Sequence, residues 1–258
     1  MDEYVAKENI KRFALVFLAF CTACANAEKL KITPESEALY FKALPYLDGV
    51  DKEDNEFFNK YPPGSAEAKP SEEQKKQYRE RLQSLLSKGI PLIKQSAEAG
   101  NPAAQYRLAW ISSRFVPRDQ VADKVCSLLR SSLNQGFTPA GLQMMFYCFD
   151  EVKTSEFRSL IDALPENEAF YSKYYPQPWM MPSCDWSGTS YSDSIVPLND
   201  KDFRANLYMS FATQMSTQNL KQEQLHYLNK AAEYGCAHAI ERIKLKQTIE
   251  VQAAGAAP

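Results

Sequence analysis

The side chains that could carry out chemistry are few and widely separated. The chain has only two histidines, His226 and His238, and neither lies at a spacing from cysteine or histidine that is typical of a metal site. No G-x-S-x-G segment is present to hold a hydrolase nucleophile. Ser192-Asp193-Ser194 lacks the amide of the Ser-Asp-Asn signature found in penicillin-binding proteins. We therefore expect no catalytic residue, no metal, no cofactor and no enzymatic activity.

The N-terminus has the pattern of an export signal. Lys7, Lys11 and Arg12 precede an apolar run, Phe13–Ala25, of 13 residues. That run is too short to cross the roughly 30 Å apolar core of a bilayer. Ala25-Asn26-Ala27 then predicts cleavage after Ala27, which leaves no stable membrane span. A retained membrane anchor is the alternative.

The elements that would position any site are helices joined by a recurring turn. In the segment Lys94–Trp110, Gly100 suits the left-handed conformation that ends many helices. Asn101 can cap the next helix, and Pro102 fits its first position. The same pattern occurs at three glycines: Gly100, Gly136 and Gly235. A small residue lies four positions before each glycine, and an alanine lies four positions after it. The first two glycines are 36 residues apart, a spacing typical of repeats built from paired helices.

This frame resembles the sel-one-like repeat, a relative of the tetratricopeptide repeat with the approximate pattern A-A-E-x-G-x-x-x-A. Ala231–Ala239 (AAEYGCAHA) is the best match, and Ala97-Glu98-Ala99-Gly100 follows the pattern nearly as well. The resemblance covers about half of the chain. It implies an all-α, right-handed α-solenoid of helix–turn–helix repeats, a curved surface that suits protein binding.

The expected organisation has six parts. They are a signal peptide (1–27), a lead segment (28–70), sel-one-like repeats (71–150), a degenerate repeat with an irregular insert (151–200), a C-terminal repeat (201–250) and a disordered tail (251–258). Within the lead segment we expect a short helix over Pro34–Leu44 and a solvated acidic loop over Asp48–Glu56.

Four cysteines remain after signal cleavage, an even number in an exported chain: Cys126, Cys148, Cys184 and Cys236. Cys126 and Cys148 each lie 11 residues from Phe137, so antiparallel helices would bring them to the same height. That pairing leaves Cys184 for Cys236. Buried free thiols are the alternative to both disulfides.

The insert is rich in aromatic residues, methionine and proline and cannot be a regular helix. One hypothesis has it filling the concave face of the solenoid. The other has it facing outward as a recognition patch, because aromatic residues and methionine are enriched at binding hot spots. The candidate partner-binding residues are Tyr174, Tyr175, Trp179, Met180, Met181, Trp186 and Tyr191.

The formal net charge of −2 provides no basic excess for phosphates, so a nucleic-acid partner is not expected. Export, the repeat resemblance and the missing catalytic motifs favour a periplasmic protein that binds one protein partner. The sharpest form of this hypothesis is an immunity protein that neutralises a periplasm-acting toxin, such as a secreted phospholipase. The alternatives are an envelope-biogenesis scaffold and a β-lactam- or cell-wall-recognising enzyme on the same repeats. The sequence leaves the oligomeric state open.

Overall fold

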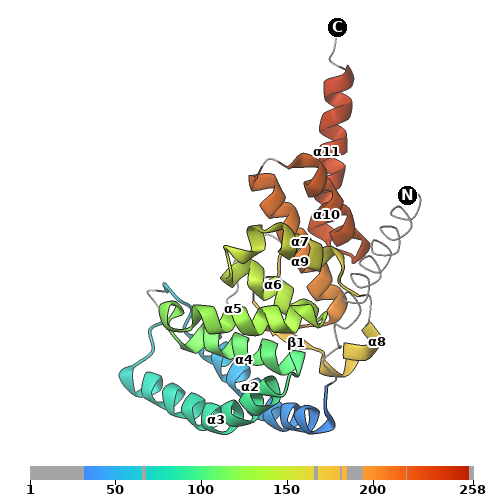
Figure 1. The fold of residues 1–258 in the computed structure, drawn as a ribbon. Helices are drawn as coiled ribbons and strands as arrows, with labels where there is room; N and C mark the ends of the chain where they lie inside the picture. The colour runs from blue at the N-terminus through green and yellow to red at the C-terminus, as the bar shows by residue number, and fades with distance from the viewer. Residues whose placement is uncertain are drawn as a thin grey trace, which may run out of the picture. The chain divides into compact units, whose positions relative to one another are not determined.

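The computed structural model describes residues 32–65, 68–165, 168–180, 182–184, 194–218 and 220–255, with side chains as far as Ile249. The signal peptide, Met181, Trp186 and Tyr191 lie outside these residues. The described chain is predominantly helical (Figure 1), so the all-α expectation is confirmed. The major helices are α2 (Pro34–Lys60), α3 (Glu72–Glu98), α4 (Pro102–Phe115), α5 (Arg118–Asn134), α6 (Thr138–Tyr147), α7 (Ser155–Asp162), α9 (Asp200–Thr217), α10 (Lys221–Glu233) and α11 (Ala237–Gly255).

The three recurring glycines adopt the conformation expected of them. Gly100, Gly136 and Gly235 have φ angles of 88°, 85° and 88°, a region that side chains with a Cβ rarely occupy. Asn101 caps α4 as expected, because its side chain accepts a hydrogen bond of 3.1 Å from the Ala104 amide. These turns fold α3 onto α4, α5 onto α6 and α10 onto α11.

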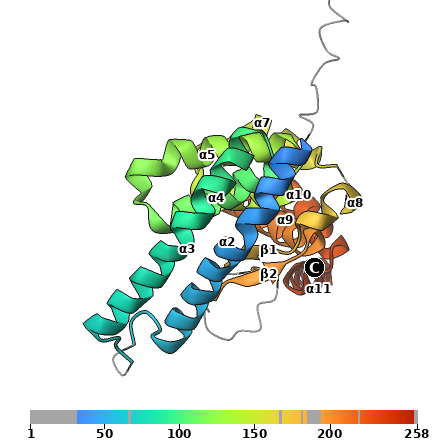
Figure 2. The ribbon, with the colours of Figure 1, turned by 90° about the horizontal axis from the view of Figure 1, so that it is seen from below.

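The lead segment differs from the expectation. Asp48–Glu56 is not a solvated loop, and the helix does not end at Leu44: α2 runs unbroken from Pro34 to Lys60. Helical spacing turns Tyr40, Ala43, Leu47 and Val50 toward the core, and Figure 2 shows α2 lying alongside α3. Two acids of the expected loop, Asp51 and Asp54, are buried as ion-pair partners and do not face solvent.

At the other end of the chain, α11 extends to Gly255, so most of the expected disordered tail (251–258) is helical. Residues 256–258 lie outside the described part.

The insert contains short elements, among them two strands that an all-α expectation did not include. These elements are α8 (Glu168–Tyr171), a 3₁₀ turn (Ser172–Tyr174), β1 (Gln177–Trp179) and β2 (Val196–Leu198). The strands pair antiparallel, with Pro178 opposite Pro197. A further 3₁₀ turn, Glu151–Lys153, precedes α7.

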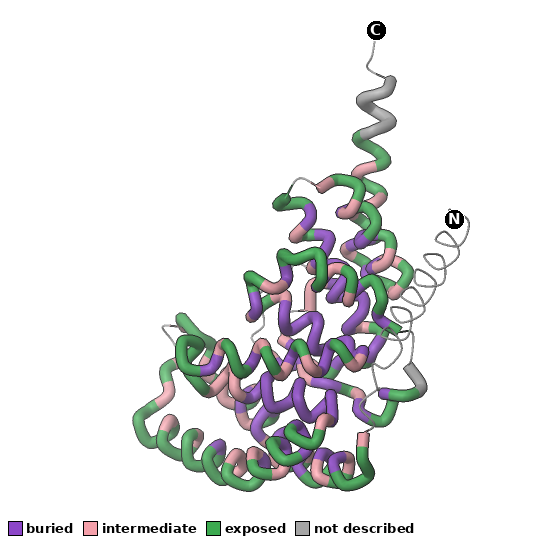
Figure 3. Tube along the Cα trace, in the orientation of Figure 1, coloured by how far each residue is buried: buried purple, intermediate pink, exposed green. Residues whose placement is uncertain are grey.

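The core follows the middle of the helical array. Buried residues concentrate in α4, α6 and α9, whereas α3 is exposed over much of its length (Figure 3). In α4 every residue from Pro102 to Ile111 is buried. The successive packing of helix pairs is compatible with an α-solenoid.

Candidate functional site

A groove of about 450 Å³ lies between α2 and the β1–β2 hairpin. Its α2 wall includes Asp48, Lys52, Asn55 and Glu56, which recur at helical spacing on one face. The opposite wall is formed by the insert, including Lys173, Tyr174, Tyr175, Pro176 and Pro197. Arg107, a buried cation, lies at the base of the groove. The rim of the groove carries exposed side chains of both charge signs.

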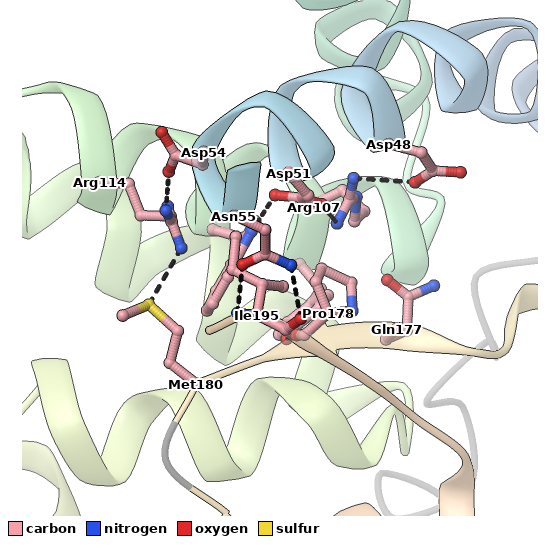
Figure 4. Close-up of polar contacts among 12 residues, drawn as sticks. Asp48, Asp51, Asp54, Asn55, Arg107, Arg114, Gln177, Pro178, Met180 and Ile195 are labelled. Atoms are coloured by element: carbon pink, nitrogen blue, oxygen red, sulfur yellow. Dashed lines mark hydrogen bonds and ion pairs between the residues drawn. The ribbon is translucent and has the colours of Figure 1, made fainter. Parts of the chain in front are cut away.

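Arg107 is held by two carboxylates of α2 (Figure 4). Its guanidinium donates to Asp51 at 2.8 Å and to Asp48 at 3.2 Å, while Trp110 Nε1 donates to the other Asp51 oxygen at 3.1 Å. Burial by itself lowers the pKa of Arg107, but Asp51, with smaller contributions from Tyr40 and Asp48, outweighs it, and the pKa lies above its usual value. The guanidinium is therefore charged, and it fixes α4 against α2.

A second buried ion pair lies further along the same two helices. Arg114 contacts the carboxylate of Asp54, and Tyr78 of α3 donates a hydrogen bond to that carboxylate. Arg114 also reaches the insert, with Nη1 lying 3.0 Å from the sulfur of Met180 (Figure 4). Through this arginine, three helices and the insert share one polar cluster.

Helix side chains hold the insert by its backbone. Asn55 of α2 donates to the Ile195 carbonyl at 2.8 Å and accepts from the Ile195 amide at 2.6 Å (Figure 4). Tyr106 of α4 donates to the Pro178 carbonyl at 2.6 Å, and Asn206 of α9 accepts from the Cys184 amide at 3.1 Å. These bonds pair backbone groups of the insert with side chains of three helices. The helices therefore bind the insert through its backbone, as proteins often bind an extended peptide.

The expected partner-binding residues fall into three groups. Tyr174 and Trp179 are only 2% and 4% exposed, so the outward-facing hypothesis is wrong for these two side chains. Tyr174 donates to Glu37 at 2.6 Å, and Trp179 packs against Trp110 and Phe203. Both side chains are instead buried against the helices, where their rings remove apolar area from water.

Tyr175 and Met180 are partly exposed. Tyr175 lines the groove and donates to Asp200 at 2.6 Å, whereas Met180 packs on Arg114. Met181, Trp186 and Tyr191 belong to the segment that the structure leaves undescribed.

Sequence reasoning missed the polar residues of the groove. Asp48, Asp51 and Asp54 recur at intervals of three residues, and Arg107 and Arg114 are seven residues apart on the expected helix after Gly100. Both spacings place like charges on one helix face. Two such faces of opposite sign were a signal that α2 is a helix and forms ion pairs with α4.

The cysteines pair as the hairpin geometry favoured. Cys126 bonds to Cys148, with their Cα atoms 5.8 Å apart, and Cys184 bonds to Cys236. Two disulfides indicate an oxidising, extracytoplasmic compartment. Cys126, Cys148 and Glu151 are the one group of cysteine, histidine and acidic side chains in the described chain close enough to share a metal, but the disulfide leaves no thiolate to bind one.

The histidines lie apart from the groove. His226 lies at the surface, 3.8 Å from Asp162, and His238 Nδ1 lies 3.3 Å from the Ser183 carbonyl. Among the helices that the structure describes, none is long and apolar enough to cross a membrane.

No protein-family model matches this sequence, and comparisons with curated proteins and with solved structures gave no significant match.

Proposed function

We propose that this is a non-enzymatic periplasmic protein that binds one protein partner. The most concrete form of this proposal is an immunity protein that neutralises a periplasm-acting secreted toxin, such as a phospholipase, by direct binding. We further propose that its helix pairs are sel-one-like repeats forming a right-handed solenoid.

Equivalent hydrogen bonds support the repeat interpretation. Ser96 and Ser132 occupy the position four residues before the turn glycine. Each hydroxyl donates to a carbonyl in the first turn of the preceding helix, Ser96 to Ser36 at 2.6 Å and Ser132 to Pro102 at 2.7 Å. The α2–α3 contact is therefore built like the α4–α5 contact, and α2 takes the place of the second helix of a repeat.

The observation that carries the binding proposal is the fixed groove between α2 and the insert. Asn55, Tyr106 and Asn206 hold the insert backbone, and the Cys184–Cys236 disulfide ties it to the start of α11. A partner that binds a surface ordered in advance loses less conformational entropy than one that must order a loop. A groove of this kind suits tight inhibition of one protein.

Exposed charges on the rim give the groove its specificity. Lys52 and Glu56 form an i, i+4 pair at 3.7 Å, with side chains 75% and 62% exposed. Such a surface pair stabilises a fold by only about 0–1 kcal/mol, so it can be altered without unfolding the protein. Rim charges of this type steer a partner and reject wrong ones through electrostatic complementarity.

The test exchanges these two charges. Lys52→Glu combined with Glu56→Lys keeps the pair but reverses the charge pattern that a partner meets. The matched control makes the same exchange at Lys94 and Glu98 of α3, another exposed i, i+4 pair at 3.7 Å. A partner is first identified by affinity purification from periplasmic and secreted fractions, and its affinity for each purified variant is then measured by calorimetry.

We expect the groove exchange to weaken binding at least tenfold and the control exchange to leave it unchanged. Equal affinity in both variants would remove the groove as the binding site. For the immunity form, the partner should be a toxin whose activity the wild-type protein blocks and the groove variant does not. Several housekeeping envelope partners that tolerate the exchange would favour a scaffold, and covalent labelling by a penicillin would favour the enzyme.

A further inference from the structure

The last helix of the array carries large apolar side chains that no helix in the described part of the chain covers. In α11, Ile240, Leu245 and Ile249 are 37%, 61% and 55% exposed. Alignment on the turn glycines places Ile240 at the position of Gln105 in α4, and Leu245 at that of Trp110. Both α4 residues are buried, because α5 and the insert cover them.

The packing pattern shows what is missing from α11. The second helix of an earlier pair lies against a later helix, as α4 lies on α5, α6 on α9 and α9 on α10. Of these second-position helices, α11 alone has no following helix among the described residues (Figure 1).

A groove of about 550 Å³ marks this end of the array, between α10 and the outer half of α11. Leu220, Leu225, Ile243 and Ile249 supply its apolar lining. Leu225 is 42% exposed, so the groove offers apolar area that a bound side chain would remove from water. Several large apolar residues of an amphipathic helix would fill such a groove, as in helix-in-groove recognition.

The charge of the groove selects among amphipathic helices. Lys221 and Lys246 line it, and no acidic residue does among the side chains that the structure describes, which end at Ile249. The segment from Lys221 to Ile249 carries five basic residues and three acidic ones, although the whole chain has a net charge of −2. An acidic helix therefore gains attraction here, and a basic one is repelled.

We propose that the α10–α11 groove docks an amphipathic helix of a partner protein, with apolar residues on one face and acidic residues flanking it. A second copy of this chain is a poorer occupant, because a symmetric contact would bring Lys221 and Lys246 of both copies together. This surface is separate from the groove at α2, so it constitutes a second interface.

The experiment uses the purified full chain and two synthetic, fluorescein-labelled helical peptides. Both peptides carry leucines on one face; one has glutamates and the other lysines on its flanks. Fluorescence anisotropy measures their binding to the wild type, to Lys221→Glu with Lys246→Glu, and to a control with the same change at two exposed lysines elsewhere, Lys76 and Lys124. Light scattering on the same samples reports the oligomeric state.

We expect the wild type and the control to bind the acidic peptide at least tenfold more tightly than the basic one. The groove variant should reverse this preference, a gain that misfolding could not produce. Equal binding of both peptides, or an unchanged preference in the groove variant, would overturn the proposal. A dimer of the full chain that dissociates in the groove variant would overturn it in favour of a second copy. None of these outcomes depends on the groove at α2.

Discussion

At the scale of single residues, Arg107 is the largest fully buried side chain in the described chain. Its side chain is 1% exposed and its charge is balanced by Asp51 at 2.8 Å. Bringing a charge out of water costs several kcal/mol, and attraction offsets that cost only while the partner is present. The pair thus makes the α2–α4 contact sensitive to either residue.

Asp51→Asn should lower the free energy of unfolding by about 3 kcal/mol or more, because it leaves Arg107 buried without its main counter-charge. Adding Arg107→Met should recover part of that loss, since no buried charge then remains unpaired and Asp48 is 66% exposed. Urea unfolding followed by circular dichroism gives these values. Glu98→Gln is the control, because it breaks an exposed pair worth about 0–1 kcal/mol. A loss no greater than that of the control would show that Arg107 does not depend on Asp51.

At the scale of elements, the turn glycines decide how each hairpin closes. All three have positive φ angles, but their surroundings differ. A Cβ at Gly136 would lie 2.7 Å from Cγ of Pro165, whereas at Gly235 the nearest atom would be Cε of Lys201 at 3.9 Å. A proline ring cannot swing away, and a lysine side chain can.

Gly235→Ala should therefore destabilise the protein by about 1–2 kcal/mol through backbone strain alone. Gly136→Ala carries the same strain and also clashes with Pro165, so we expect a clearly larger loss. Thermal unfolding of the two variants, measured side by side, tests the difference. Equal losses would mean that the segment around Pro165 moves aside without cost.

At the scale of the whole molecule, covalent links and buried charges join segments that are far apart in sequence. The Cys184–Cys236 disulfide closes a span of 52 residues and holds the insert to α11, whereas Cys126–Cys148 closes a span of 22 within one hairpin. From chain entropy, the longer link is expected to stabilise the fold by about 4 kcal/mol and the shorter link by about 3 kcal/mol.

Replacing Cys184 and Cys236 by serine should thus cost more stability than replacing Cys126 and Cys148. The helical circular dichroism should persist below the unfolding transition in both variants, because the helix contacts do not require either bond. Denaturant unfolding of both double variants provides the comparison. The reverse order would indicate that local packing around Cys126 outweighs chain entropy.

The sequence by itself determined the features that depend on neighbours along the chain. A glycine with a positive φ angle, an asparagine cap and a proline at the first helical position act within a few residues, so the hairpin turns could be predicted. The Cys126–Cys148 pair followed from one of those turns, because antiparallel helices bring the two cysteines to the same height, and Cys184–Cys236 was the pair that remained.

Only the tertiary structure decided what depends on contacts across the chain. Asp48–Glu56 looks like a solvated loop until Arg107 and Arg114 supply counter-charges that make burial of Asp51 and Asp54 favourable. Tyr174 and Trp179 look like exposed recognition residues until α2 and α4 bind the insert backbone through Asn55 and Tyr106. A local pattern gives the type of each side chain, but its burial is set by partners 50 or more residues away, because the free energy of burying a charge or a ring depends on what surrounds it.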